Sequence, residues 1–231
     1  MPEITIALDC ALPPVSVAVA VDGLLIGAWE QAPDQVNSGA RHSDAVVMAL
    51  RAIANAHAVD LSKTKSIIAT NGPGSFTGLR VGLSLAQGLQ AGSDATAFTI
   101  GSLEAIALSL SLRAGGERSA PFAVCIDAKR DRVFLQTFSA DARPLDACRL
   151  LNVSDAKAEL APSLGAFSFA VFGSGAFLVC AERAEAADAH SWATDLLRAP
   201  AQLRLEVAKH FRPIYLRDAD AKPARVAFRR V

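Results

Sequence analysis

The alternation of apolar and polar residues near the N-terminus predicts a small antiparallel sheet. Residues 4–8 form an apolar run, and valines alternate with smaller residues over 15–21. That period of two is typical of a strand. Asp22-Gly23 is a strong hairpin signal, and residues 24–29 are predicted to return as the third strand. The chain therefore begins with three consecutive paired strands.

The segment 42–58 has the periodicity of a helix that is apolar on two sides. Its main stripe consists of Val46, Leu50 and Ile53. A second face carries mostly small residues: Ala45, Met48, Ala52 and Ala56. Because a surface helix normally has one apolar stripe, this helix is predicted to be covered on both sides.

A glycine-rich turn and the helix after it organise the chain. Residues 66–70 form a short apolar strand, Gly72 and Gly74 permit a tight turn, and Ser75 is placed to cap a helix that reaches Ala91. Two faces of this helix are apolar: Phe76, Leu79, Leu83 and Ala86 on one, and Gly78, Val81, Gly82, Leu85, Gly88 and Leu89 on the other. A glycine inside a helix costs up to about 1 kcal/mol against alanine. The glycine face is therefore predicted to admit a second helix closely.

The two helices together predict an association surface for another protein subunit. The residues of this predicted interface are Ala45, Met48, Ala52, Ala56, Gly78, Val81, Gly82, Leu85 and Leu89. The alternative is a helix pair buried inside one chain, which the apolar pattern alone leaves open.

The rest of the chain continues to alternate between strand and helix patterns. Predicted strands cover residues 96–99, 122–127, 133–138, 145–151 and 167–172. Predicted helices cover 101–113, 154–160 and 191–210, the last one kinked or split at Pro200. The irregular tail carries Arg217, Lys222, Arg225, Arg229 and Arg230, a run more typical of a solvated end than of a ligand site.

A weak internal repeat relates the two halves of the chain. Ile6–Ala11 resembles Val124–Ala128, because each is an apolar strand that ends in an aspartate and precedes a turn and a second strand. A strand running into a glycine turn follows in each half, at Ile68–Gly74 and Ala170–Gly175. The repeat predicts two related α/β units with a cleft between them at the strand ends.

Composition excludes several classes of protein. The 231 residues are 52% hydrophobic, and 23 basic residues balance 23 acidic ones, which argues against a generally basic nucleic-acid-binding surface and weakly favours association. No apolar run reaches membrane-spanning length, and no basic region precedes the first apolar run, as a signal peptide requires. The four cysteines lack metal-like or redox spacing. We therefore expect a cytoplasmic protein.

Asp9 and Asp127 are predicted to lie near strand ends, at positions from which a carboxylate is able to hold a metal-bound nucleotide. The predicted nucleotide-cleft residues are Asp9, Asp127, Ser75, Thr77 and Arg80. The alternative is that each aspartate only caps a turn. The glycine turn is neither a P-loop nor a G-x-S-x-G elbow, and the turn after Asp9 contains Pro13-Pro14, which offers no amide to a phosphate. The pattern indicates an enzyme-type scaffold whose chemistry is missing.

The glycine-rich stretch resembles the signature of the TsaB (YeaZ) family. The similarity rests on Gly-Pro-Gly-Ser-Phe-Thr-Gly-Leu-Arg-Val-Gly at 72–82 and on Ala-Gln-Gly-Leu at 86–89. Further support comes from Leu8-Asp9, His42-Ser43-Asp44, Ile126-Asp127-Ala128 and Tyr215-Leu216-Arg217. One departure is Cys10, where relatives often have threonine after the first aspartate, and it weakens any nucleotide site at Asp9.

This resemblance implies a duplicated actin-like ATPase (ASKHA) fold of the α/β class, with two lobes of mixed sheets flanked by helices. The expected lobes are 1–102 and 103–212, with the last helix packing back on the first lobe, and 213–231 as an irregular basic tail. It also implies a non-catalytic scaffold that activates the catalytic paralogue TsaD in the N6-threonylcarbamoylation of adenosine 37 in tRNAs reading ANN codons.

The expected partners follow from the same resemblance. They are TsaD, the ATPase TsaE, a second copy of the chain when it is alone, and tRNA indirectly through the complex, with no membrane. No tightly bound cofactor or metal is expected, and ATP or ADP only in the complex. One alternative is a stand-alone actin-like ATPase or small kinase. A glycoprotease-type metallopeptidase is disfavoured, because the His-x-x-x-His pair of a TsaD-type metal site is absent.

Overall fold

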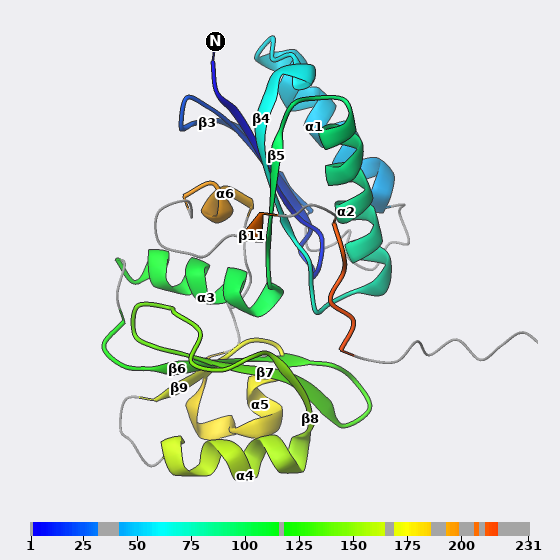
Figure 1. Cartoon of the computed structure of the whole chain (residues 1–231). Coiled ribbons are helices and arrows are strands. Elements are labelled where there is room, and N and C mark those ends of the chain that lie inside the picture. Colours follow the sequence, from blue (N-terminus) through cyan, green and yellow to red (C-terminus); the bar gives the residue numbers. More distant parts are fainter. Residues whose placement is uncertain are drawn as a thin grey trace, which may run out of the picture.

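The computed structural model describes residues 2–31, 42–115, 118–164, 169–185, 193–198, 206–207 and 211–216. Two sheets lie one above the other, with helices between them and outside them (Figure 1). The α/β class with two mixed sheets flanked by helices is confirmed.

The first sheet is built on the N-terminal meander. Its strand order is β11-β5-β4-β1-β2-β3. The bounds are β1 Ile4–Asp9, β2 Ser16–Val21, β3 Leu24–Glu30, β4 Thr64–Thr70, β5 Thr96–Ile100 and β11 Glu206–Val207. β1, β2 and β3 pair antiparallel, whereas β4 and β5 run parallel to β1. The predicted hairpin at Asp22-Gly23 joins β2 to β3.

The second sheet repeats this arrangement. Its order is β10-β9-β6-β7-β8, with β6 Phe122–Asp127, β7 Arg132–Phe138, β8 Arg149–Asn152, β9 Ala170–Phe172 and β10 Ala184–Glu185. β6, β7 and β8 are antiparallel, and β9 and β10 run parallel to β6. Each sheet therefore contains an antiparallel meander whose first strand is extended on its other side by two parallel strands. The prediction from the internal repeat that the two α/β units are related is confirmed.

Helices cover both faces of each sheet. The α-helices are α1 His42–Ala56, α2 Phe76–Ala91, α3 Ser102–Arg113, α4 Val153–Leu164, α5 Ala176–Val179 and α6 Ala193–Leu196, and the short 3₁₀ helices are η2 Leu61–Lys63 and η3 Ala181–Arg183. α1 and α2 lie on the outer face of the first sheet, and α4 and α5 on the outer face of the second (Figure 1). In the described part of the chain, no helix is both long and apolar enough to cross a bilayer.

α3 lies between the two sheets and contributes to two cores. Ala105 and Leu108 pack with first-sheet residues and with α6, whereas Leu103 and Ile106 pack with aromatic residues of the second sheet. The helix is almost entirely buried because both of its sides face a sheet. The predicted division into 1–102 and 103–212 falls within the first turn of this shared helix and stays a prediction.

One predicted element is wrong. The segment 191–210 was expected to be mostly helical; of its described residues, Ala193–Leu196 are helix, but Glu206–Val207 form a strand that pairs antiparallel with β5. An edge strand such as β5 presents unpaired backbone groups, and pairing with them overrides helix propensity here. The predicted kink at Pro200 and the basic tail from Arg217 onward lie outside the described residues.

Candidate functional site

The glycine turn between β4 and α2 is held in place by its backbone and by a helix cap. Gly72 has a φ of 105°, a conformation that favours glycine, and its carbonyl accepts a 2.8 Å hydrogen bond from the Ser102 amide. The Ser75 hydroxyl accepts a 3.2 Å bond from the Gly78 amide, which confirms the predicted cap. The start of α2 is therefore fixed by local residues.

Three glycines of this segment lie against the turn that follows β1 of the same chain. A Cβ atom at Gly78 would lie 2.1 Å from the carbonyl oxygen of Cys10, and one at Gly74 would lie 2.2 Å from that of Ala11. At Gly82 it would meet the Cβ of Cys10 at 2.8 Å. These glycines allow the backbone after β1 to contact the helix backbone directly.

The prediction that Gly78 and Gly82 belong to an intermolecular surface is therefore wrong. Both are buried, and what approaches them closely is not a second helix but the turn after β1. Gly88 differs, because a Cβ there would meet nothing within 4 Å. Leu85 and Leu89 are half-buried and pack against the core between α1, α2 and the first sheet. Helical periodicity groups residues by face but does not reveal which neighbour covers that face.

Small residues and one methionine remain exposed on the outside of the helix pair. Met48 is 63% exposed, Ala52 and Ala56 are exposed, and Ala45 and Val81 are half-buried. α1 packs beside α2 (Figure 1), and α2 adds the open position Gly88 on its last turn. We call the exposed members of this set, Met48, Ala52, Ala56 and Gly88, the outer helix face. Methionine is enriched in protein interfaces.

Asp9, at the end of β1, lies beneath the surface. Asp9 is 2% exposed. Its carboxylate accepts hydrogen bonds from the Thr70 hydroxyl at 2.9 Å and from the Ala11 amide at 3.3 Å. Burial raises its pKa to about 7, against the lowering effect of these two bonds. Asp9 therefore does not line an open cleft as predicted, and its contacts are those of the alternative, a carboxylate that caps the turn.

The turn after Asp9 packs against the N-terminal end of α2 and occupies the space in front of it. The Ser75 amide donates a 2.7 Å hydrogen bond to the carbonyl of Ala11, so a donor that a phosphate would need at this helix end is already used. Burial also raises the pKa of the adjacent Cys10 thiol, which therefore stays protonated and behaves as a packed apolar group.

Asp127 occupies the equivalent place at the end of β6, but its side chain is 24% exposed. The Lys129 amide and ammonium group donate to its carboxylate at 2.7 and 2.6 Å. Partial burial acts to raise the pKa of Asp127, yet the bonds and the charge of Lys129 outweigh it, so the pKa lies below its usual value. The Asp127 amide donates to the Ser174 hydroxyl at 3.1 Å.

Thr77 and Arg80 are exposed at the start of α2. The guanidinium carbon of Arg80 lies 3.7 Å from the centroid of the Phe76 ring, and its Nε donates a long 3.4 Å bond to the Tyr215 hydroxyl. The centroids of the Phe76 and Tyr215 rings are 5.5 Å apart. We call Phe76, Arg80 and Tyr215 the ring–guanidinium surface.

Sequence reasoning missed this surface. The predicted apolar face groups Phe76 with Leu79, but Phe76 is 49% exposed and its ring packs against that of Tyr215. Tyr215 entered only as part of a family motif. The contact between Arg80 and Tyr215 joins residues 135 positions apart, and no periodic pattern reports such a distance.

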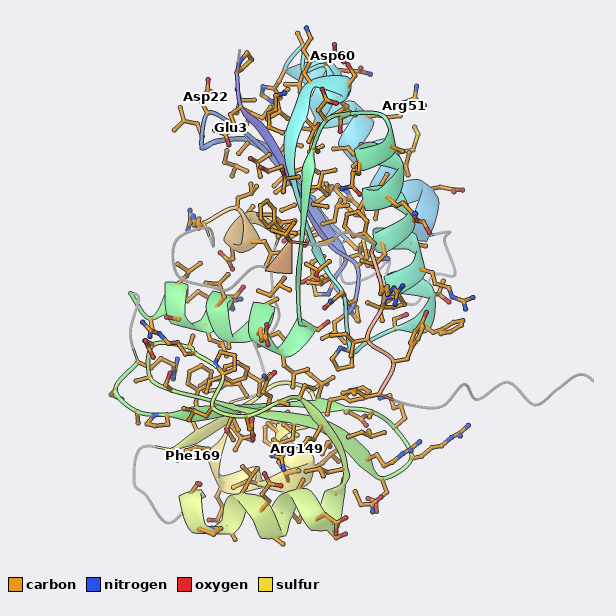
Figure 2. The ribbon with its side chains drawn as sticks, viewed as in Figure 1. Glu3, Asp22, Arg51, Asp60, Arg149 and Phe169 are labelled. Atoms are coloured by element: carbon orange, nitrogen blue, oxygen red, sulfur yellow. The ribbon has the colours of Figure 1, made fainter. Side chains whose placement is uncertain are left out.

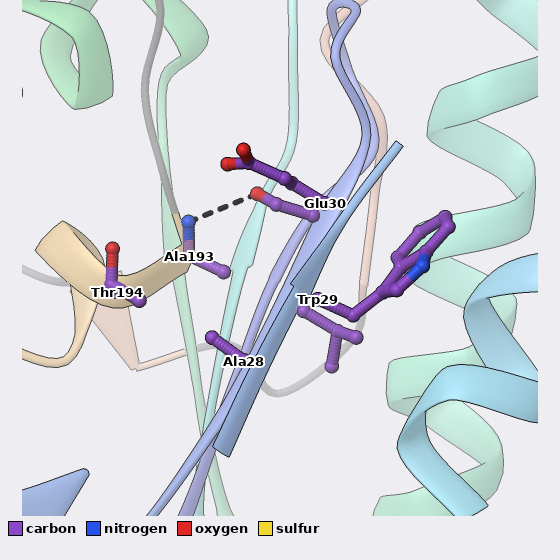
Figure 3. A pocket seen from close by; sticks show the side chains of 7 residues that line it. Ala28, Trp29, Glu30, Ala193 and Thr194 are labelled. Carbon is purple, nitrogen blue, oxygen red and sulfur yellow. Dashed lines mark hydrogen bonds between the residues drawn. The ribbon is translucent and has the colours of Figure 1, made fainter. Parts of the chain in front are cut away.

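A cavity of about 260 Å³ lies between the edge of the first sheet and α6. It is lined by Ser16, Val17, Ala28, Trp29, Glu30, Ala193 and Thr194 (Figure 3). The Ser16 hydroxyl already accepts a 3.0 Å bond from the Ala193 amide. Among the residues that the structure describes, no group of three or more His, Cys, Asp or Glu side chains is arranged to hold a metal ion.

Comparison with known proteins identifies the relatives of this chain. Residues 36–159 match the family model of TsaD, tRNA N6-adenosine threonylcarbamoyltransferase. Over 136 residues the chain is 26% identical to the tRNA threonylcarbamoyladenosine biosynthesis protein TsaB of Escherichia coli (strain K12). That match covers 59% of this chain and 55% of the relative, so the chain spans little more than half the length of this curated protein.

Two solved structures share the fold across nearly the whole chain. YeaZ from Pseudomonas aeruginosa superimposes with a TM-score of 0.72 at 23% identity, covering 93% of this chain and 100% of that one. A crystal structure of an uncharacterized protein with similarity to the peptidase YEAZ from Pseudomonas aeruginosa gives a TM-score of 0.71 with the same identity and coverage. The arrangement of two lobes is therefore common to all three chains.

Proposed function

The chain belongs to the TsaD family of tRNA N6-adenosine threonylcarbamoyltransferases, in its TsaB (YeaZ) branch, and we propose that it is a non-catalytic subunit in the biosynthesis of tRNA threonylcarbamoyladenosine. In this role it pairs with the catalytic paralogue TsaD, and the complex modifies adenosine 37 of tRNAs reading ANN codons. TsaE joins the pair, and the chain forms a homodimer when it is alone.

The outer helix face is the observation that carries this proposal. Met48 is 63% exposed, Ala45 and Ala52 lie one turn from it on α1, and Gly88 has open space where a side chain would stand. Small side chains let a second helix approach closely, and a flexible methionine fills the irregular gaps that remain. This face accommodates a helix pair of a related subunit better than it accommodates a small ligand.

The contacts at the end of β1 support a non-catalytic role. In the part of the chain that the structure describes, Asp9 is buried under its own turn, and the carbonyls of Cys10 and Ala11 lie against the start of α2. Carbonyl oxygens repel a phosphate, whereas a phosphate site presents amides. We therefore propose that ATP or ADP is bound in the complex and not by this turn.

A single added charge on the outer helix face tests the proposed pairing. Ala52→Arg places a guanidinium on an exposed position of α1, so the monomer is expected to fold while pairing with TsaD is lost. Size-exclusion chromatography of the variant with purified TsaD measures the complex, and assay of threonylcarbamoyladenosine in the reconstituted reaction measures its consequence. We expect loss of both the complex and the modified nucleoside.

A matched control separates the interface from a general effect of charge. Ala158→Arg introduces the same side chain at an exposed position of α4, on the second lobe. The control is expected to pair with TsaD like the unmodified chain. Retained pairing by Ala52→Arg, or equal loss in both variants, would contradict the assignment of the interface to α1 and α2.

A further inference from the structure

The open edge of the first sheet is a surface that the proposed pairing with TsaD does not use. β3 is the last strand of that sheet, and among the described strands it pairs with β2 alone. α1 and α2, which carry the outer helix face, cover one face of the sheet, and α6 lies on the other face, beside β3 (Figure 1). An edge strand presents backbone groups to which a further strand is able to bind. The β3 edge and the outer helix face are therefore separate surfaces.

The register between β2 and β3 determines which backbone groups face this edge. The Gln31 amide donates a 2.8 Å hydrogen bond to the carbonyl of Val15, so these residues form a hydrogen-bonded pair. Such pairs alternate along an antiparallel ladder, which makes the pair at Trp29 the next one. Ala28 and Glu30 therefore direct their amides and carbonyls away from β2. A strand added at this edge finds two donors and two acceptors there.

A bulge limits the regular part of the edge. The register shifts between Val19 and Ala20, and Ile26 is the extra residue on β3. A bulge twists an edge strand and interrupts regular pairing. Residues 27–30 are therefore the part of β3 that accepts another strand, and the strand that fits is a short one.

The same end of β3 borders the cavity beside α6. Ala28 and Glu30 lie on one face of the sheet, because they are two residues apart on one strand. Both are exposed, and both line the cavity of about 260 Å³. Figure 3 shows the Glu30 side chain on the α6 side of β3 and the Trp29 side chain on the opposite side. The backbone edge and the cavity are therefore continuous, since the same residues form both.

Glu30 gives the cavity its charge. The other lining residues are uncharged, and Ser16 and Thr194 among them carry hydroxyl groups. Within the described part of the chain, the Glu30 carboxylate has no ion pair or hydrogen bond. Carboxylate and hydroxyl oxygens accept hydrogen bonds, whereas an ammonium or guanidinium group only donates them. The cavity is therefore complementary to the end of a lysine or arginine side chain.

We propose that the β3 edge binds an extended segment of a partner protein that carries a lysine or arginine. The segment pairs with the backbone of Ala28 and Glu30 as an added strand, and its basic side chain enters the cavity beside Glu30. In this mode of recognition main-chain hydrogen bonds provide affinity and side-chain pockets provide specificity. A second copy of the chain paired through β3 does not fit, because β3 contains no lysine or arginine. The inference does not depend on the proposed function.

The test measures the fluorescence anisotropy of labelled peptides mixed with the full chain. The lysine peptide is Thr-Lys-Thr-Val-Thr-Val-Thr, in which lysine and both valines share one face of a strand. The glutamate peptide has glutamate in place of lysine. We expect the lysine peptide to bind roughly 5-fold more tightly or better, because an ion pair with Glu30 is replaced by repulsion.

Two further peptides test whether the ligand binds as a strand. Both keep the lysine sequence, but one is N-methylated at the lysine and valine amides and the other at the threonine amides. Successive amides of a strand point to opposite edges, so only one of the two sets faces β3. We expect one methylated peptide to lose binding and the other to retain it.

Variants of the chain test the two parts of the surface. Glu30→Lys is expected to reverse the preference, so that the glutamate peptide binds more tightly than the lysine peptide. Ala28→Pro removes one outward amide, a change that an edge strand tolerates, and is expected to weaken binding of the lysine peptide. Glu3→Lys is the matched control, because Glu3 is exposed beside Asp22, at the opposite end of β3 from Glu30 (Figure 2). This control is expected to keep the original preference, and thermal unfolding checks the fold of each variant.

Several outcomes would overturn the proposal. Equal binding of the lysine and glutamate peptides, or an unchanged preference in Glu30→Lys, would show that Glu30 does not select the ligand. Equal binding of the two methylated peptides would exclude an added strand, and displacement of the lysine peptide by an equal concentration of butylammonium would show that the cavity binds a free amine. Binding of no peptide would show that Glu30 and the bulge only protect the edge from pairing.

The test also separates this inference from the proposed function. Glu30→Lys is expected to pair with TsaD like the unmodified chain, and Ala52→Arg to bind the lysine peptide like the unmodified chain. Loss of TsaD pairing in Glu30→Lys would overturn the inference, since the β3 edge would then belong to that interface. If the unmodified chain fails to pair with TsaD but binds the lysine peptide as described, the proposed function fails and this inference stands.

Discussion

The two halves of the molecule have the same strand order but place the aspartate at the end of the first strand in different environments. Asp9 is 2% exposed and accepts hydrogen bonds from Thr70 and Ala11. Asp127 is partly exposed and pairs with Lys129. A repeated backbone therefore does not repeat a site, because the carboxylate environment is set by turns and side chains that the two halves do not share.

The glycine turns show what the halves do share. At Gly74 and Gly78 a Cβ atom would meet a carbonyl oxygen after β1 at 2.2 and 2.1 Å, and at Gly173 it would meet the carbonyl oxygen of Cys125 at 2.4 Å. In both halves the glycines of the turn allow one backbone segment to pack directly on another. Only the first half continues into a helix of 16 residues, whereas the second continues into one of four. Only the first half therefore has a long second helix, which packs beside α1.

The largest effect is expected from adding a methyl group, in each half, to a glycine that lies against a carbonyl oxygen. Gly78→Ala and Gly173→Ala each place a Cβ within 2.5 Å of a carbonyl oxygen, and overpacking against rigid backbone is expected to lower the free energy of unfolding by about 3 kcal/mol or more. Gly173 also has a φ of 106°, which adds strain for any side chain. Urea denaturation of the two variants measures both losses.

Gly88→Ala is the matched change at a glycine without such a neighbour. Its Cβ would stand in open space, so the helix propensity of alanine is expected to raise the free energy of unfolding by about 0.8 kcal/mol. A similar destabilisation at all three glycines would show that the distinction between packed and open glycines is not correct. A mild effect at Gly173 alone would break the equivalence of the two halves.

Much of the fold follows from patterns that are local in the sequence. The strand that ends in Asp9 and the strand that ends in Asp127 are each followed by a second strand, and both pairs form as predicted. The cap by Ser75 depends on residues three positions apart, so the sequence contains all the information for it. The strand at 206–207 is not encoded by local residues in this way, because it forms only by pairing with β5.

The candidate site was less predictable because its properties depend on contacts between distant segments. Helical spacing placed Gly78 and Gly82 on one face with Leu85, but the residue that explains both glycines is Cys10, on another element. Likewise, the ring that packs against Phe76 belongs to Tyr215, near the other end of the chain. Periodicity assigns residues to faces, and only the tertiary structure assigns neighbours to those faces.

The next largest effect concerns the opposite pKa shifts of the two aspartates. Burial raises the pKa of Asp9 from 3.8 to about 7, so between about pH 4 and pH 7 the folded chain retains a proton that the unfolded chain loses. Stability therefore falls as the pH rises through this window. Asp9→Asn removes the titration and keeps an acceptor for Thr70. We expect the variant to exceed the unmodified chain by up to about 4 kcal/mol at pH 8, and to match it near pH 3.

Asp127→Asn should show the reverse. Despite partial burial, the pKa of Asp127 is lowered by Lys129. The contribution of Asp127 to stability is therefore present above its pKa in the unfolded chain and is lost as the pH falls through its pKa in the folded chain. Because the pair is exposed, the variant is expected to lose less than about 1 kcal/mol at neutral pH. Thermal unfolding across pH 3–8 compares both variants, and parallel pH profiles for the two would contradict the contrast in their environments.

The smallest effect is expected in the turn that follows Asp127, where the second half differs from the proline-containing turn of the first. Lys129, Arg130 and Asp131 have φ values of 63°, 58° and 57°. Asp131→Gly removes the backbone strain of one left-handed residue. It keeps the hydrogen bond that the Val153 amide donates to the carbonyl of residue 131. Since glycine also gains freedom in the unfolded chain, we expect a net stabilisation of about 0.5 kcal/mol.

Asp22→Gly makes the same substitution at a φ of 50° in the first half, but with the opposite expected sign. The carboxylate of Asp22 accepts a 2.7 Å hydrogen bond from the Glu3 amide, and the two residues lie side by side at the end of the first sheet (Figure 2). Losing this bond costs about 1 kcal/mol of stability. That loss exceeds the stability gained when glycine replaces an aspartate in the left-handed conformation. Urea midpoints with unchanged m-values measure both variants. If both turns respond alike, the side-chain hydrogen bond does not decide the stability of the turn, and the left-handed backbone alone does.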